Sequence, residues 1–351
     1  MEKTGEAPLK KIILAVILLF AAVSVRAQSA LPFPQVAPWN GHKAAASLTF
    51  DDSDPSQLAV AIPELNRRGL HGTFFLIANR TDEKDEWRQA FKAGHELGNH
   101  SLDHLHPAGL NPGQEQSQVA GAQVVLQNAF GIPIYSYAYP YSEITPGILK
   151  WVQQNCFIAR GGYGTYYMKP DSDPDWFNIP AQTTLSATPV SVYQQWIDQD
   201  FSSGAWMVFM IHGLEGTPWG YEPIKTVVFN QILDALQAKD IWVDTFSGVG
   251  AYWKAEKVFE KAPPVQSAGQ VQWTWNLPDH FLPQVVLRMK LQDSKASARI
   301  GLFQAGKQLL PDSRGLYSVS FDEKELTEER ETRKGAQSQS SRGDSKSYFL
   351  D

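Results

Sequence analysis

The sequence predicts an α/β protein, a distorted (β/α)7-type barrel followed by a small C-terminal antiparallel β unit. Short apolar runs alternate with helical stretches from residue 44 to residue 261, as is typical of a parallel sheet covered by helices. About seven such repeats favour a closed or nearly closed barrel over an open sheet. Beyond residue 262 the pattern changes to alternating apolar and polar residues, which is typical of antiparallel strands.

Strands and helices follow one another through the barrel region. The expected strands lie at residues 46–50, 72–77, 96–98, 135–139, 157–159, 178–180, 206–211 and 241–245. The expected helices lie at residues 57–68, 87–93, 114–130, 145–155, 191–201 and 225–239. Gly69 and Gly131 stop two of these helices, because glycine adopts the left-handed conformation of a helix end without strain.

The regions that flank the barrel differ from it in composition. Residues 28–43 are rich in Pro and predict an extended segment. Residues 262–264 are typical of a linker, and residues 262–321 form the expected small β domain, with strands at 271–275, 285–291, 298–304 and 316–321. Residues 322–351 are polar, charged and rich in Ser and Gly, so they are predicted to be disordered.

The N-terminus is typical of an export signal. Lys10 and Lys11 precede an apolar run at residues 12–25, which ends in Val25-Arg26-Ala27. The run is shorter than the roughly 18–20 apolar residues that span a bilayer. We therefore expect a signal peptide at residues 1–27 and a secreted or periplasmic protein, in preference to an uncleaved membrane anchor.

Charge and cysteine content exclude some partners and sites. Residues 1–27 hold four of the 31 basic and two of the 37 acidic side chains, so the mature chain would carry a net charge of −8. This charge argues against a polyanionic partner such as nucleic acid. Cys156 is the only cysteine, so neither an internal disulfide nor a thiolate metal site is expected.

Polar residues at the carboxyl ends of the strands are the candidates for chemistry, because active groups of parallel barrels gather there. Asp51 and Asp52 directly follow the strand 46–50, and two adjacent carboxylates after a buried run are costly unless paired or bound to a cation. The alternative is a helix-capping Asp with a solvated neighbour.

Three histidines also follow expected strands. His100 and His104 come after the strand at 96–98, and a spacing of four would place both imidazoles on one helical face. Such a pair suits zinc-like metals. His212 directly follows the strand 206–211 and is a candidate general acid. A structural histidine at a strand end is the alternative for His212.

Five segments, in their order and spacing, resemble the polysaccharide deacetylases with a NodB-homology domain, carbohydrate esterase family 4. The family's Thr-Phe-Asp-Asp-Gly motif is similar to Thr49-Phe50-Asp51-Asp52-Ser53, and its His-(Ser/Thr)-x-x-His motif is similar to His100-Ser101-Leu102-Asp103-His104. Pro-Tyr-Gly is similar to Pro140-Tyr141-Ser142, Leu-x-His to Met210-Ile211-His212, and the Thr-Phe-Phe strand to Thr73-Phe74-Phe75. The resemblance covers residues 44–255.

The resemblance implies a NodB-like barrel and a role for each site residue. A divalent metal, Zn²⁺ or else Co²⁺ or Ni²⁺, would be bound by Asp52, His100 and His104. Asp51 would be the general base and His212 the general acid, while the N–H of Tyr141 would stabilise the oxyanion. Apart from the resemblance, candidates for contact with an acetylated sugar are Tyr139 and Pro140, which follow the strand 135–139, and the aromatic residues Trp176, Trp219, Tyr166 and Tyr167. Packing is the alternative for the tryptophans.

The chain departs from the family's pattern at three places. The glycine of the first motif is Ser53, and serine tolerates a positive φ poorly. The arginine of the third motif, which pairs with the catalytic Asp in the family, falls at Ala138, so Asp51 is expected to lack its cation. The acidic residue that orients the catalytic histidine is only loosely matched by Asp173, Asp175 and Trp176.

The sequence thus favours a metal-dependent hydrolase that removes acetyl groups from an exported or extracellular polysaccharide or amino sugar. Hydrolysis of a non-sugar amide on the same barrel is a second hypothesis. A carbohydrate-binding protein that has lost catalysis is a third, and Ala138 keeps it open.

Overall fold

A computed structural model describes residues 33–216, 220–267, 269–291 and 300–330. The chain divides into a unit of residues 1–31 and a unit of residues 32–351. The first unit, and with it the expected signal peptide at residues 1–27, lies outside the described residues. Among the described residues, no helix combines the length and the apolar character that crossing a membrane requires.

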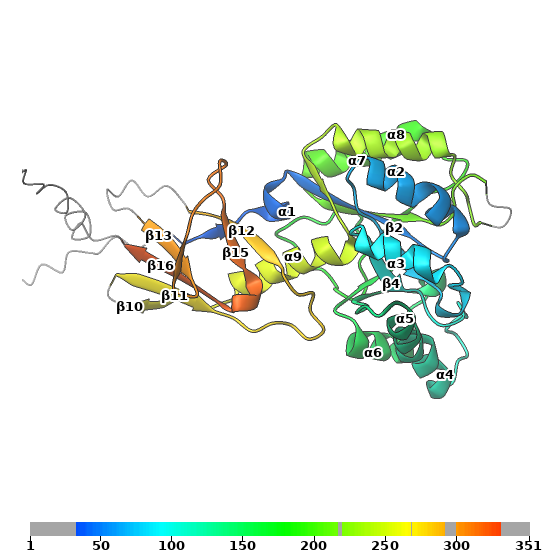
Figure 1. Cartoon of the computed structure of the whole chain (residues 1–351), viewed down its shortest axis with the longest axis horizontal. Helices are drawn as coiled ribbons and strands as arrows, with labels where there is room; N and C mark the ends of the chain where they lie inside the picture. The colour runs from blue at the N-terminus through cyan, green and yellow to red at the C-terminus, as the bar shows by residue number, and fades with distance from the viewer. Residues whose placement is uncertain (1–32, 217–219, 268, 292–299, 331–351) are drawn as a thin grey trace, which may run out of the picture. The chain divides into compact units, whose positions relative to one another are not determined.

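A curled sheet of parallel strands forms the centre of the barrel and confirms the predicted fold class (Figure 1). The strands run in the order β6-β5-β4-β3-β2-β8-β7, and β9 pairs with β2 off this path. Their bounds are β2 Ala44–Phe50, β3 Thr73–Leu76, β4 Glu96–Asn99, β5 Ser136–Ala138, β6 Ile158–Arg160, β7 Gln182–Thr183, β8 Trp206–Ile211 and β9 Ile241–Val243. Residues 44–46 of β2 pair with β9, and its last two residues pair with β3. Two strands thus share one edge of β2.

The gap between β6 and β7 is spanned by the segment that precedes β7. Arg160 of β6 forms an isolated parallel bridge with Ile179, and β7 pairs with β8. The strand predicted at residues 178–180 is thus a single bridge, and the regular pairing begins at Gln182. This segment thus connects β6, at one end of the sheet, with β7 and β8 at the other end through backbone hydrogen bonds.

Helices cover the outside of the sheet (Figure 1). Their bounds are α1 Pro38–Gly41, α2 Ile62–Arg67, α3 Lys84–Lys92, α4 Pro112–Gln116, α5 Ala122–Phe130, α6 Pro146–Asn155, α7 Val190–Ser203, α8 Thr226–Gln237 and α9 Phe246–Glu260. Shorter helical turns are η1 Gln57–Ala61, η2 Ala78–Arg80, η3 Ser117–Gly121, η4 Pro140–Ser142 and η5 Phe321–Glu323. The predicted helix 57–68 is η1 followed by α2, and the predicted helix 114–130 is α4, η3 and α5. Gly131 ends α5 with a φ of 69°, as predicted.

The core of the barrel lies between the sheet and the helices. Every residue of β2 and of β8 is buried, because helices cover one face of these strands and the other face lines the barrel interior. Strands buried on both faces have continuous apolar sequences, which is why these two were the clearest in the sequence. Leu48, Phe50 and Phe209 belong to one large cluster with Phe229 of α8.

Helix α9 packs against the amino ends of the strands and was not predicted. Gly250 of α9 lies against Ile158 and Trp206. The buried carboxylate of Glu96 accepts hydrogen bonds from Thr73 Oγ1 at 2.8 Å and from the backbone N–H of Ser247, in the first turn of α9, also at 2.8 Å. Apolar residues occur all round α9, so the amphipathic period that marks a surface helix is weak.

The C-terminal residues form two antiparallel sheets, as predicted in outline. One has the order β1-β12-β15 and the other β10-β11-β16-β13-β14. The bounds are β1 Gln35–Val36, β10 Val265–Ser267, β11 Gln270–Thr274, β12 Val286–Lys290, β13 Ile300–Gln304, β14 Lys307–Leu309, β15 Tyr317–Ser320 and β16 Glu325–Arg330. The predicted extended segment at residues 28–43 contributes β1 and α1, while residues 28–32 lie outside the described part.

The disorder predicted from residue 322 onward is wrong for residues 322–330. These residues form the end of η5 and the strand β16, which pairs with β11 on one side and β13 on the other. Only alternate residues of a strand face the core, and Leu326 and Glu328 are the buried ones here. A strand with a single apolar residue has a composition that resembles a disordered tail.

Candidate active site

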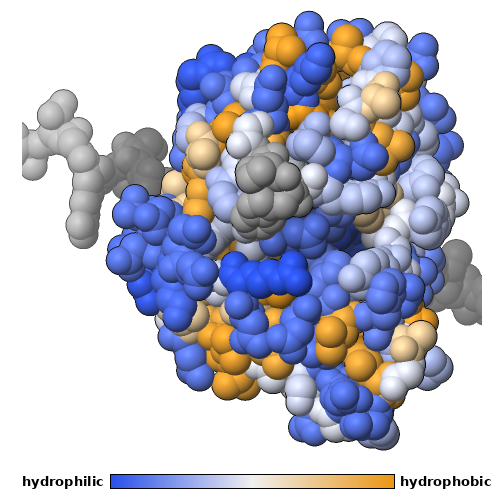
Figure 2. All heavy atoms as spheres, turned by 90° about the vertical axis from the view of Figure 1, so that its right-hand side faces the viewer, coloured by the Kyte–Doolittle hydropathy of each residue, from blue (hydrophilic) through white to orange (hydrophobic). Residues whose placement is uncertain are grey.

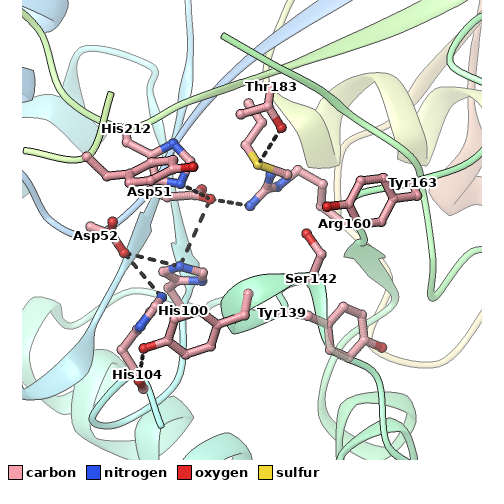
Figure 3. A pocket seen from close by; sticks show the side chains of 13 residues that line it. Asp51, Asp52, His100, His104, Tyr139, Ser142, Arg160, Tyr163, Thr183 and His212 are labelled. Carbon is pink, nitrogen blue, oxygen red and sulfur yellow. Dashed lines mark hydrogen bonds and ion pairs between the residues drawn. The ribbon is translucent and has the colours of Figure 1, made fainter. Parts of the chain in front are cut away.

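A cavity of about 400 Å³ opens at the carboxyl ends of the parallel strands. Figure 2 looks onto this face, which is hollowed near its centre and mostly hydrophilic around the hollow. The lining residues come from the ends of β6, β7 and β8 and from the loops that follow β2, β4, β5, β6 and β8, and Figure 3 shows them from close by. They are Asp51, Asp52, His100, His104, Tyr139, Tyr141, Ser142, Arg160, Tyr163, Thr183, Met210, His212 and Tyr221.

Asp52, His100 and His104 converge in this cavity as a set of metal-ligating side chains (Figure 3). Asp52 Oδ1 lies 3.5 Å from His100 Nε2 and 3.3 Å from His104 Nε2. Tetrahedral ligands at about 2.0–2.1 Å from a zinc ion are separated by about 3.3 Å. Asp52 Oδ1 and His100 Nε2 are buried and have no hydrogen-bond partner within the described residues. The three side chains therefore fit a divalent cation.

The loop after β4, and not a helix, presents the two histidines. The expectation of a shared helical face is wrong, because residues 100–104 are irregular and both Ser101 and His104 have a positive φ, of 70° and 59°. Ser101 Oγ accepts a hydrogen bond from the backbone N–H of His104 at 2.9 Å. His100 Nδ1 donates to the carbonyl of Ala138 at 2.9 Å, which leaves Nε2 free to face the other ligands.

The turn after β2 separates the two aspartates. Asp52 and Ser53 have φ values of 75° and 55°, so the serine adopts the left-handed conformation that its glycine counterpart would take with less strain. The hydroxyl of Ser53 accepts a hydrogen bond from the buried N–H of Ile77 at 3.0 Å. The substitution of the motif glycine thus keeps the turn and adds a link to the end of β3.

Asp51 is paired with a cation, contrary to the expectation from Ala138. Arg160 Nη2 lies 2.5 Å from Asp51 Oδ2, and both side chains are almost completely buried. Arg160 belongs to β6 and is the register partner of Ala138 on β5. Arg160 could have been found in the sequence, because it directly follows the predicted strand 157–159 and so occupies a strand end.

His212 lies on the other side of Asp51. Its Nε2 is 3.8 Å from Asp51 Oδ2. Within the described residues His212 Nδ1 has no hydrogen-bond partner, and the loosely matched Asp173 and Asp175 line a separate cavity. The structure therefore places His212 in the site without the expected acidic residue behind it.

The pKa values of the site reflect burial opposed by neighbouring charge. Burial lowers the pKa of His104 to about 4, with a further contribution from His100, so its imidazole is neutral and available as a ligand. Burial also lowers the pKa of His212. For His100, burial lowers the pKa, but Asp51 and Asp52 outweigh burial and raise it. Burial raises the pKa of Asp52, but the neighbouring imidazole of His100, together with those of His212 and His104, holds this pKa well below its usual range.

Of the sugar-contact candidates Tyr139, Pro140, Trp176 and Trp219, two do not line the cavity, and a third is not described. Pro140 is buried and lines a different, smaller cavity, and Trp176 packs against Trp253 with ring centroids 5.3 Å apart. Trp219 lies outside the described residues. Tyr139 lines the cavity, although its hydroxyl donates to the carbonyl of Phe177.

Exposed tyrosines surround the cavity mouth instead. Tyr141, Tyr163 and Tyr221 are 49%, 80% and 58% exposed and line the cavity. The ring of Tyr141 lies 4.5 Å from that of His104, and the ring of Tyr221 lies 4.8 Å from that of His212. Tyr141 was a candidate from its motif, whereas no pattern in the sequence distinguishes Tyr163 and Tyr221 from packing aromatics.

The structure thus combines an α/β barrel with a set of two histidines and one carboxylate that fits a divalent cation, next to a buried Asp–Arg pair. Residues 40–156 match the family model described as polysaccharide deacetylase. This match, which covers about a third of the chain, agrees with the family that the sequence motifs resemble. Two of the three curated relatives below are also described as deacetylases.

Three curated relatives illustrate the match. The chain is 28% identical to YxkH of Bacillus subtilis over 108 residues and 28% identical to a gellan lyase of a Bacillus species over 160 residues. It is 26% identical over 143 residues to the peptidoglycan-N-acetylglucosamine deacetylase of Bacillus cereus. These matches cover 29%, 45% and 40% of this chain but only 39%, 6% and 64% of the relatives.

A solved structure from Mycobacterium smegmatis shares the fold. It superposes with a TM-score of 0.53 at 16% identity and covers 68% of this chain and 99% of its own. An acetyl xylan esterase of family 4 from Clostridium thermocellum has a TM-score of 0.42 at 19% identity, over 58% of this chain and 89% of its own.

Proposed function

We propose that the protein is a metal-dependent hydrolase that removes acetyl groups from an acetylated polysaccharide or amino sugar. The observation that carries this proposal is the convergence of Asp52, His100 and His104 beside Asp51 and His212 in one cavity. Asp52, His100 and His104 would hold the divalent metal, and one carboxylate with two imidazoles suits Zn²⁺, Co²⁺ or Ni²⁺. When bound, the metal supplies Lewis acidity, which makes water a nucleophile near neutral pH.

The remaining steps are carried out by side chains and by one backbone group of the protein. Asp51 accepts the proton of the attacking water. Its carboxylate lies next to the three possible metal ligands but is not one of them, so it is available as a base. His212 gives a proton to the leaving nitrogen or oxygen of the sugar. The backbone N–H of Tyr141 donates to the acetyl oxygen as negative charge develops there. The separation of 3.8 Å between Asp51 Oδ2 and His212 Nε2 keeps the proton acceptor and the proton donor in one cavity.

The exposed tyrosines support a sugar as the substrate. Tyrosine rings offer a flat apolar face with a polar edge, which suits the face of a sugar ring. We assign the role expected for Trp176 and Trp219 to Tyr141, Tyr163 and Tyr221, which line the cavity mouth. The expected signal peptide at residues 1–27 supports a substrate outside the cytoplasm, and the negative charge supports a partner other than nucleic acid.

The test combines metal analysis with acetate release. Wild-type protein is expected to bind about one equivalent of metal and to release acetate from acetylated xylan, chitin oligomers or peptidoglycan, with the release abolished by a chelator. The variant His100→Ala is expected to lose most of the metal and the activity while remaining folded, because it removes a buried ligand. His42→Ala is the matched control, since His42 pairs with Asp240 away from the cavity.

Two outcomes would contradict the proposal. One is a wild-type protein that binds metal but releases no acetate from any of these substrates, which would favour a carbohydrate-binding protein. The other is a His100→Ala variant that retains its metal and its turnover.

A further inference from the structure

Two adjacent carboxylates lie beside the imidazole of His100 in this site. Asp52 Oδ1 lies 3.5 Å from His100 Nε2, and Asp51 Oδ2 lies 4.0 Å from the same nitrogen. The two side chains have the same chemistry, but only Asp52 belongs to the set of possible ligand atoms that His100 and His104 complete. Something other than residue type must therefore decide which aspartate is a ligand and which is a base.

Arg160 is the group that distinguishes the two aspartates (Figure 3). Its guanidinium contacts Asp51 Oδ2 at 2.5 Å, while the ion pairs of Asp52 in the structure are with the two histidines. The side chains of Arg160 and Asp51 are 1% and 3% exposed, whereas that of Asp52 is 28% exposed. Arg160 Nε and Nη1 have no hydrogen-bond partner among the described residues, so the bond to Asp51 is the main compensation for burying this charge.

We infer that Arg160 is a positioning residue that holds the Asp51 carboxylate away from the metal, so that Asp51 stays available as a base. This inference rests on the proposed function of the site. A guanidinium at hydrogen-bond distance competes with a metal for the same oxygen, because a charge-assisted bond of this kind is strong when buried. Without Arg160, the Asp51 carboxylate would be free to become a further ligand of a bound cation and would no longer be available as a base.

The pairing of β5 with β6 explains how an arginine at position 160 acts on Asp51. Ala138 and Arg160 are register partners in parallel strands. Neighbouring strands lie about 4.8 Å apart, and register partners project their side chains to the same face of the sheet. Ala138 is completely buried and its side chain is a methyl group, which leaves the guanidinium of Arg160 room beside it. An arginine on either strand can therefore approach the same carboxylate.

The experiment replaces Arg160 and then moves the arginine to the neighbouring strand. Three proteins are loaded with Co²⁺: wild type, Arg160→Ala, and the double variant Arg160→Ala/Ala138→Arg, which has the wild-type composition. The visible absorption of the bound Co²⁺ reports which groups coordinate it. Arg160→Ala is expected to bind Co²⁺ at least as tightly as wild type, with a changed spectrum because Asp51 becomes a ligand. The double variant is expected to recover the wild-type spectrum.

Turnover is the second readout. Arg160→Ala is expected to lower kcat roughly 10- to 100-fold with KM nearly unchanged, and the double variant is expected to regain most of that loss. Added guanidinium ion is expected to restore part of the activity of Arg160→Ala. Lys254→Met is the control for loss of a buried cation, because Lys254 contacts the carbonyl of Phe157 outside the cavity.

The two readouts separate this inference from the proposed function. An Arg160→Ala protein that is folded by its thermal transition and shows the wild-type Co²⁺ spectrum overturns the inference, whatever its activity. A double variant that folds and binds Co²⁺ but keeps the spectrum of Arg160→Ala overturns the claim that either strand can supply the cation. An inactive wild type whose spectrum still responds to Arg160→Ala contradicts the proposed function and leaves the positioning role supported.

Discussion

At the scale of the residue, two buried carboxyl groups show two ways in which the fold accommodates such a group. Glu96 accepts hydrogen bonds from Thr73, Ser136 and Ser247. Asp200 of α7 is completely buried, and neither of its carboxyl oxygens has a hydrogen-bond partner among the described residues. Burial alone raises the pKa of Asp200 to about 9. Asp200 is therefore protonated in the folded protein at neutral pH.

Asp200 makes stability fall as the pH rises. The unfolded chain releases the proton of Asp200 near its ordinary pKa of 3.8, whereas the folded protein holds it until about pH 9. Between these values the unfolded state binds fewer protons, so the free energy of unfolding decreases with pH. Asp200→Asn is expected to remove this decrease and to stabilise the protein at pH 7 by roughly 4 kcal/mol. Urea unfolding between pH 5 and pH 9 measures the effect.

The control for Asp200→Asn is Asp198→Asn on the exposed side of the same helix, where the carboxylate pairs with Lys239. This variant is expected to retain the pH dependence of wild type. An Asp200→Asn protein with the same pH slope as wild type would show that Asp200 is ionised in the folded state.

At the scale of the element, the loops that end the strands determine the site. The strands predicted at residues 46–50, 96–98 and 206–211 imply that Asp51, His100 and His212 share one edge of the sheet, because parallel strands end together. The local conformation of residues 100–104 could not be predicted. Ser101 Oγ accepts a hydrogen bond from the N–H of His104, and both residues have a positive φ, which the sequence does not indicate. His100 and His104 thus lie side by side, as their spacing predicted, but a loop brings them together and not a helix.

The turn after β2 gives a test at this scale. Ser53 has a φ of 55°, and its hydroxyl accepts a bond from the buried N–H of Ile77. Ser53→Ala is expected to destabilise the protein by about 1–2 kcal/mol, because the N–H of Ile77 loses its partner while the backbone strain remains. Ser53→Gly loses the same bond but relieves the strain, so it is expected to cost less. Chemical unfolding of both variants orders them, and a more stable Ser53→Ala would refute this account.

At the scale of the whole molecule, contacts between distant segments complete both the barrel and the β unit. Ile179 links β6 to the segment that leads into β7, and α9 covers the amino ends of the strands. Tyr252 of α9 donates a hydrogen bond to the carbonyl of Ala37 at 2.6 Å and accepts one from the N–H of Arg288 at 3.2 Å. The helix thus joins the N-terminal segment to β12.

Strand β16 tests the organisation of the β unit. A chain truncated after Phe321 lacks β16, which lies between β11 and β13, so both neighbours lose their backbone partner. We expect this truncation to abolish the near-ultraviolet circular dichroism of Trp273 and Trp275, whose indoles are buried in the same unit. A chain truncated after Arg330 retains every described strand and is the matched control. Equal spectra from the two truncated chains would contradict the assignment of β16.

The fold class, the order of the main strands and helices, and the candidates Asp51, Asp52, His100, His104, Tyr141 and His212 could all be predicted from the sequence. These predictions depend on apolar period, on strand ends and on short motifs, which are local properties of the chain. The cation beside Asp51, the helix α9, the positions of Tyr163 and Tyr221 at the cavity mouth and the strand β16 emerged only in the folded structure. The pairing of Arg160 with Asp51 depends on the register between β5 and β6. Register is set by packing across the whole sheet, so no local pattern records it.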